Sequence, residues 1–96
     1  MMNIPELTVG EFSRSIKNVV EDAFGYVRIK GEISGFKQAS SGHLYFNLKD
    51  DEGLLNAVCF KNMVQLINFE MADGLAVIAS GKISTFGARS NYQIIV

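Results

Sequence analysis

The stretch Gly31–Asp50, GEISGFKQASSGHLYFNLKD, decides the fold of this chain. It predicts the end of one strand, a polar loop and a second strand. In the second strand Leu44, Phe46 and Leu48 alternate with polar and aromatic side chains. Alternation with a period of two places the two rows on opposite faces of a sheet, so one face is buried and the other is open to a ligand. The open row is His43, Tyr45, Asn47 and Lys49.

The chain has 96 residues, of which 48% are apolar and 20% are charged, and its formal net charge is -1 at pH 7. These values predict one small soluble domain and give no overall electrostatic reason to bind nucleic acid. The charges are unevenly distributed, since basic side chains predominate in residues 26–49 and acidic ones in residues 50–74. A basic binding face is therefore compatible with a nearly neutral chain.

Cys59 is the only cysteine, which excludes an internal disulfide and a cysteine-based zinc site. Its neighbours Val58 and Phe60 predict a small buried hydrophobe rather than a reactive thiol. The sequence contains no apolar run long enough to span a membrane, and no basic start with an apolar core that would mark a signal peptide. We therefore expect a cytoplasmic setting and no membrane partner.

A helix is predicted before the first strand. Thr8 and Glu11 form the pattern of a capping box, and Gly25 lies where helices commonly stop with a left-handed residue. The apolar stripe of this helix is expected to pack on the rest of the domain, and a stripe reserved for a partner chain is the alternative. The stripe consists of Val9, Phe12, Ile16, Val19, Val20 and Ala23.

The rest of the chain predicts short strands. Gly31 and Gly81 interrupt strands and indicate bends or close backbone contacts, and Gly53 is expected to supply the positive φ of a hairpin turn. In the third strand, Leu55, Ala57 and Cys59 form one row and Leu54, Val58 and Phe60 the other, and the pattern does not decide which faces inward. The predicted strands are 26–34, 43–49, 54–60, 75–86 and 92–96, with a loop over 35–42 and a short helix or irregular crossover over 61–72.

This order of elements predicts a mainly β OB-fold, a five-stranded Greek-key barrel with a helix between its third and fourth strands. A small open antiparallel sheet with the first helix across it is the alternative. Residues 1–25 are interpreted as a helical segment packed on the barrel and residues 26–96 as the OB-fold domain. Because Val96 follows an apolar run without a turn, we expect a fragment of a longer protein, with a strand edge open to self-association.

Motifs along nearly the whole chain resemble the N-terminal domain of the exonuclease VII large subunit family. They are Ala23-Phe24-Gly25, Val27, Gly31-Glu32-Ile33-Ser34, Ser41-Gly42-His43-Leu44-Tyr45-Phe46, Leu48-Lys49-Asp50, Phe60, Gly74, Gly81 and Tyr92-Gln93. The sequence departs from the family pattern at Gln38-Ala39, where a basic residue is common. This departure leaves Lys37 as the phosphate contact of that loop.

The resemblance implies a domain that binds single-stranded DNA within a bacterial cytoplasmic enzyme. Exonuclease VII, an exodeoxyribonuclease, hydrolyses single-stranded DNA from either end and releases oligonucleotides. Its large subunit binds several copies of a small helical subunit. The resemblance also implies that the catalytic residues lie in later parts of the large subunit. We therefore expect no catalytic residue and no cofactor in this segment.

Single-strand binders of this fold combine aromatic platforms with basic groups along the backbone path. Tyr45 is the predicted platform, with His43 and Asn47 on its face, although a tyrosine packed on a neighbouring strand is the alternative. Phe36 is expected either to stack on a base or to plug the barrel end. The predicted phosphate contacts are Arg28, Lys30 and Lys82 on outward strand positions and Lys37 and Arg89 in loops beside the groove.

His43 is predicted to stack or to contact phosphate, and an ordinary hydrogen-bonded histidine is the alternative. It cannot form a histidine metal site because it is the only histidine. Asp50, Asp51 and Glu52 follow one another in a turn, so their side chains diverge and indicate a solvated turn. Besides DNA binding, a protein-interaction module for interdomain or intersubunit docking and an RNA-binding OB domain remain open.

Overall fold

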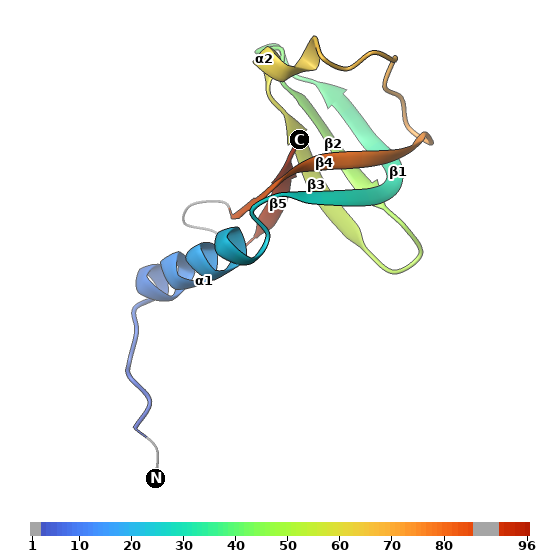
Figure 1. The fold of residues 1–96 in the computed structure, drawn as a ribbon. Helices are drawn as coiled ribbons and strands as arrows, with labels where there is room; N and C mark the ends of the chain where they lie inside the picture. The colour runs from blue at the N-terminus through green and yellow to red at the C-terminus, as the bar shows by residue number, and fades with distance from the viewer. Residues whose placement is uncertain (1–2, 86–90) are drawn as a thin grey trace.

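The computed structural model describes residues 3–85 and 91–96. The order of elements matches the predicted order, and Figure 1 shows α1 outside the barrel and α2 at one barrel end. The elements are α1 (Val9–Ala23), β1 (Val27–Gln38), β2 (Leu44–Lys49), β3 (Leu54–Cys59), α2 (Lys61–Val64), β4 (Ala76–Thr85) and β5 (Tyr92–Ile95).

The strands close into a barrel in the order β1-β2-β3-β5-β4. Only β3 and β5 run parallel, and the other neighbours are antiparallel. This topology confirms the predicted OB-fold. The open-sheet alternative is wrong, because β1 is hydrogen-bonded to β4 as well as to β2. The free edge expected at the last strand is also not found, because β5 pairs with β3 on one side and with β4 on the other.

The barrel interior is filled by the inward rows of the strands. The predicted inner row of β2 is buried, and it identifies the inner row of β3 by pairing. The pairs are Leu48–Leu55, Phe46–Ala57 and Leu44–Cys59. Ile33, Ile83 and Ile94 complete the core from β1, β4 and β5. Burial of each aliphatic or aromatic core side chain contributes roughly 1.5–3 kcal/mol to the stability of the barrel.

Strand β1 is longer than predicted, because it continues through Gly35 to Gln38, where the sequence predicts a loop. The register of the β1–β2 pairing shifts between Ser34 and Lys37, which marks a β-bulge. Gly35 lies in the bulge with φ of 59°, a left-handed value that glycine adopts without a steric penalty. The bulge allows pairing to resume, and Lys37 lies directly opposite Tyr45.

The close backbone contact expected at Gly31 is present, and Gly81, where the sequence predicts a bend, makes one as well. A Cβ atom on Gly31 would lie 3.2 Å from Cβ of Leu48. A Cβ atom on Gly81 would overlap the carbonyl oxygen of Ile95 and lie 2.7 Å from its carbonyl carbon. Gly81 is also where β4 changes its partner from β1 to β5. The missing side chain at Gly81 therefore allows the barrel to close.

The predictions of left-handed conformations at Gly25 and Gly53 are wrong, because neither has a positive φ. In the turn after β2, Oδ1 of Asp50 accepts hydrogen bonds from the N–H groups of Glu52 and Gly53, both at 2.9 Å. The Asp50 side chain therefore shapes this turn, as expected for a solvated acidic turn. Helix α1 ends at Phe24, whose N–H still donates to the carbonyl four residues earlier.

The predicted capping box begins α1. The Thr8 N–H donates to Oε1 of Glu11 and the Glu11 N–H donates to Oγ1 of Thr8, both at 3.1 Å. These two hydrogen bonds lower the pKa of Glu11, and the bond from the Thr8 backbone has a larger effect than the bond with the Thr8 side chain. A lowered carboxyl pKa means that the cap stabilises the helix at neutral pH and loses this effect as the pH falls through that lowered value.

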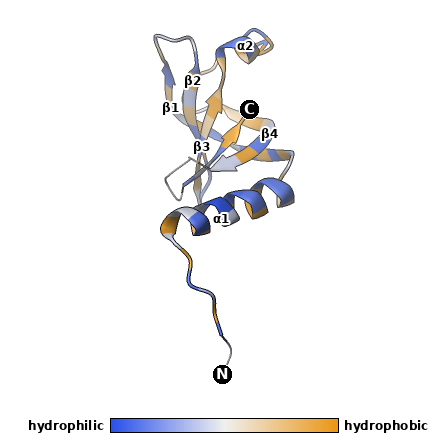
Figure 2. Ribbon diagram, turned by 90° about the vertical axis from the view of Figure 1, so that its left-hand side faces the viewer, coloured by the Kyte–Doolittle hydropathy of each residue, from blue (hydrophilic) through white to orange (hydrophobic). Residues whose placement is uncertain are grey.

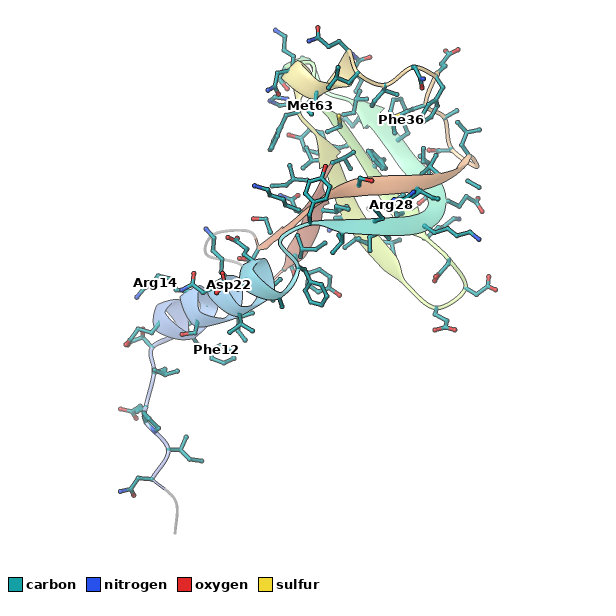
Figure 3. All side chains as sticks on the ribbon, in the orientation of Figure 1. Phe12, Arg14, Asp22, Arg28, Phe36 and Met63 are labelled. Atoms are coloured by element: carbon teal, nitrogen blue, oxygen red, sulfur yellow. The ribbon has the colours of Figure 1, made fainter. Side chains whose placement is uncertain are left out.

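Only the last part of the apolar stripe of α1 packs on the barrel, and no residue of α1 is fully buried. Val20 packs against the core and Oγ of Ser84 donates to Glu21 at 3.2 Å, so the last turns of α1 meet β4. The earlier turns project past the barrel end and leave the stripe in solvent, with Phe12 53% exposed (Figures 1 and 3). Figure 2 shows hydrophobic and hydrophilic segments alternating along this helix.

We expect Gly81→Ala to destabilise the domain by about 3 kcal/mol. Overpacking costs roughly 1–3 kcal/mol where neighbouring side chains can move, and here the neighbours are backbone atoms of β5. Urea unfolding followed by circular dichroism measures the change. Gly53→Ala is the matched control, because its Cβ would meet nothing within 4 Å. Equal stability of the two variants would contradict this account of barrel closure.

Candidate nucleic-acid interface

The outward side chains at one end of β2 and β3 form a cluster of aromatic rings. Tyr45 of β2 lies opposite Val58 of β3, which shares its row but is only 2% exposed. Next to this pair, the ring centroids of His43 and Phe60 are 5.3 Å apart, and those of His43 and Tyr45 are 6.5 Å apart, both edge to face. We call His43, Tyr45 and Phe60 the aromatic face. Tyr45 is 45% exposed and Phe60 38% exposed, so both rings can stack on bases.

The first positive charge beside the aromatic face comes from β1. Lys37 is the direct cross-strand neighbour of Tyr45, and directly opposed residues of an antiparallel pair share one face of the sheet. Ser34 and Asn56 flank Asn47 in the same way, on β1 and β3. Exposed Lys37 is therefore placed to neutralise a phosphate next to a base on Tyr45.

A second positive charge lies further along the same row of paired residues. Val58 pairs with Ile95 of β5, and Ile95 pairs with exposed Lys82 of β4. Neighbouring strands are about 4.8 Å apart, so three steps place Lys82 roughly 14 Å around the barrel from Tyr45. The row runs across the strands from Lys37 to Lys82, with apolar residues at its centre.

Arg28 and Lys30 point outward as predicted, but they lie on another part of the barrel. Arg28 pairs with Ser80 and Lys30 with Ile78, on the first half of β1, which faces β4 (Figure 3). The nine predicted DNA contacts therefore do not share one face. Tyr45, His43, Asn47 and Lys37 come together and Lys82 continues their row. Arg28 is the diagonal cross-strand neighbour of Lys82, and Lys30 lies further along β1, away from the aromatic face.

Phe36 is turned toward the core and packs against it, and its N–H donates to Oδ1 of Asp73 at 2.8 Å (Figure 3). This placement favours the barrel plug over a stacking residue. Arg89 lies outside the described residues.

Phe60 is the member of the aromatic face that the sequence pattern did not identify. Both alternating rows of the third strand are mostly apolar, so the sequence does not show which row faces outward. The pairing of β3 with β2 decides this. The alternation of β2 could have identified Phe60. It places His43 and Tyr45 on the outward face, and in a hairpin with β3 the residues paired with that row face outward too. Phe60 continues the outward row of Val58, one step beyond the end of β3.

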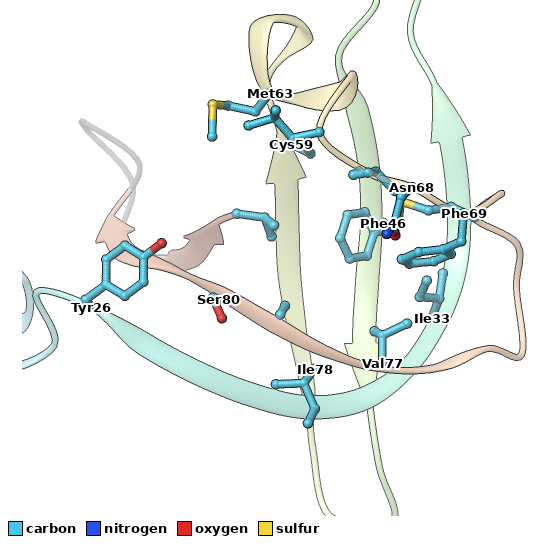
Figure 4. Close-up of a pocket in the computed structure, with 15 residues that line it drawn as sticks. Tyr26, Ile33, Phe46, Cys59, Met63, Asn68, Phe69, Val77, Ile78 and Ser80 are labelled. Carbon is cyan, nitrogen blue, oxygen red and sulfur yellow. The ribbon is translucent and has the colours of Figure 1, made fainter.

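A separate pocket of about 320 Å³ opens between the barrel and the α2–β4 crossover (Figure 4). Its walls are mostly apolar, with Phe46 from the core and Met63 and Phe69 from the crossover. Its polar side chains come from Tyr26, Cys59, Asn68 and Ser80, and none of its described lining residues is a carboxylate, lysine, arginine or histidine. The pocket is distinct from the aromatic face, because none of His43, Tyr45 and Phe60 lines it.

Within residues 3–85 and 91–96, no three side chains of histidine, cysteine, aspartate or glutamate gather as a metal-binding group. Neither described helix is both long and apolar enough to cross a membrane. The described side chains thus form a binding surface of aromatic, amide and basic groups.

Residues 7–96 match a family described as the OB-fold nucleic acid binding domain. Because this match spans nearly the whole chain, the chain belongs to that family. A solved structure with the same fold is that of the S. pombe Stn1–Ten1 complex, with a TM-score of 0.62 and 23% identity over 74% of this chain and 53% of that chain. At this identity the likeness concerns the fold alone.

Curated relatives confirm the resemblance to the exonuclease VII large subunit. The chain is 44% identical over 94 residues to the exodeoxyribonuclease 7 large subunit of Rhodospirillum centenum, covering 98% of this chain and 18% of that protein. It is 48% identical over 91 residues to the exodeoxyribonuclease 7 large subunit of Rickettsia canadensis, covering 95% of this chain and 20% of that protein. The chain therefore spans about a fifth of the length of these relatives.

Cys59 is expected to be unreactive in the folded domain. It is 1% exposed, and burial raises the pKa of its thiol. Labelling with Ellman's reagent at neutral pH should be at least about a hundredfold slower in the native protein than in urea, since it requires opening of the barrel. Because the folded thiol has the higher pKa, raising the pH should favour the unfolded state. Equal labelling rates in buffer and in urea would contradict this burial.

Proposed function

We propose that this domain binds single-stranded DNA for an exodeoxyribonuclease VII large subunit. The observation that carries the proposal is the pairing of exposed Tyr45 with Lys37 beside the ring of Phe60. A base can stack on each ring, while the ammonium group neutralises the adjoining phosphate. Stacking needs unpaired bases, so this face suits a single strand better than a duplex.

In this proposal the domain captures substrate and another part of the large subunit cleaves it into oligonucleotides. The match of this segment to a nucleic acid binding domain, over about a fifth of the length of the relatives, supports a division of labour between domains. We further propose that the enzyme acts in the cytoplasm, and that its small subunit binds the large subunit outside this domain.

Tyr45→Ala and Phe60→Ala should each weaken binding of a fluorescent single-stranded DNA oligomer about tenfold or more. Loss of one base–aromatic stack costs roughly 1–3 kcal/mol. Fluorescence anisotropy across a salt series measures the affinity, and Lys37→Glu should reduce the salt slope by about one. A folded domain that binds no single strand even at low salt would overturn the proposal.

Matched controls test the location of the interface. Tyr92 is 60% exposed on β5, at the end of the described β4–β5 pairing, so Tyr92→Ala removes a tyrosine away from the aromatic face. Lys30→Glu reverses a charge on the β1–β4 surface and should weaken binding less than Lys37→Glu. Preference for an RNA oligomer in direct competition would instead favour an RNA-binding role.

The exposed stripe of α1 favours a second function, docking within a longer polypeptide. Val9, Phe12 and Val19 are each more than half exposed, and a continuous apolar stripe in solvent marks an interaction surface. The matched segment is about a fifth of each relative, so other parts of such a polypeptide are available to cover it. We propose this occupant in preference to a second copy of the domain.

Phe12→Glu should change the stability of the 96-residue chain by less than about 0.5 kcal/mol, because the side chain is exposed. In a full-length large subunit the same substitution should lower the melting temperature, because it would bury a charge. Arg14→Glu, outside the stripe, is the matched control. Concentration-dependent dimerisation of the 96-residue chain that Phe12→Glu abolishes would show that a second copy covers the stripe.

A further inference from the structure

The structure holds His43 in a single orientation. Nδ1 of His43 accepts a hydrogen bond from the backbone N–H of Lys61 at 2.8 Å. Lys61 is the first residue of α2, whose N-cap residue Phe60 makes no side-chain cap, so the imidazole satisfies an otherwise free helix N–H. A neutral imidazole that accepts through Nδ1 carries its proton on Nε2.

The loop before β2 supports this orientation. The Ala39 N–H donates to the carbonyl of His43 and the Gly42 N–H donates to the carbonyl of Ala39, both at 2.9 Å. Gly42 has φ of 94°, and a Cβ atom there would lie 3.1 Å from the Lys61 side chain. The β1–β2 loop and the start of α2 are therefore joined on both sides of the imidazole.

The second ring nitrogen is free to serve a ligand. Nε2 has no hydrogen-bond partner among residues 3–85 and 91–96, and it is not among their buried unpaired atoms, so it meets solvent. The imidazole lies edge to face against both Tyr45 and Phe60. The result is one N–H donor in contact with two exposed rings.

We propose that His43 donates its Nε2–H to a phosphate oxygen of a bound single strand whose neighbouring bases stack on Tyr45 and Phe60. This inference rests on the proposed function. Because His43 adjoins both rings, the backbone that links a base on Tyr45 to a base on Phe60 would pass close to this donor. A phosphate contact carries no sequence information, so His43 contributes to affinity equally for every base.

Two substitutions separate the two nitrogens. In His43→Asn the amide can replace Nδ1 and keep the bond to Lys61, while the outer donor is lost. In His43→Gln the longer side chain can replace the Nε2–H, while the bond to Lys61 is lost. We expect His43→Asn to lose only the ring contacts, and so to melt at a higher temperature than His43→Gln. It should bind oligomers of dT, dA and dC about tenfold more weakly than the wild type, as for a hydrogen bond to a charged group. His43→Gln should melt at a lower temperature and recover most of that affinity.

The outcomes distinguish this inference from the proposed function. If the wild type binds and Tyr45→Ala weakens binding, wild-type affinity of His43→Asn overturns the role of His43 alone. A loss confined to one base overturns the assignment to phosphate. If the wild type binds no single strand, both proposals fail. Imidazole nitrogen chemical shifts of the wild type test the tautomer without any variant, and a proton on Nδ1 overturns the proposal.

Discussion

Burial of the inner row of β2 is the constraint on which the rest of the structure depends. Leu44, Phe46 and Leu48 fill the barrel, and a slip of one residue would exchange them with the outward row at a cost of several kcal/mol. Their burial places Tyr45 and His43 on the outer face of the barrel. Strand pairing then determines which side chains of β3 share that face. The core therefore determines the orientation of the binding groups, although it touches no ligand.

The binding surface can exist on an almost neutral domain because its charges are local. Lys37 adjoins Tyr45 by strand pairing, whereas the acidic side chains of the β2–β3 turn lie at the opposite end of the two strands. At physiological salt the electrostatic range is about 8 Å. A bound phosphate therefore responds to the nearest ammonium group more strongly than to the net charge.

The sequence was sufficient where one period or one local pattern decided the outcome, as in the alternation of β2 and the Thr8–Glu11 cap. It was insufficient where pairing between distant segments decided it. The bulge at Gly35, which brings Lys37 to Tyr45, and the outward position of Phe60 both depend on register. The extent to which the helix stripe is covered could not be predicted, because periodicity identifies an apolar side of a helix but not how much of it another element covers.

The order of pairings along the chain has a consequence for folding. β1, β2 and β3 form a meander of sequence neighbours, whereas closure joins Val27 to Gly81 and Val58 to Ile95. Loop-closure entropy makes distant pairings slow, so the meander can form first. Such an intermediate already displays Tyr45 on one side while its inner row is open to water on the other. The interval before β4 and β5 dock is thus the stage at which the chain is most exposed to aggregation.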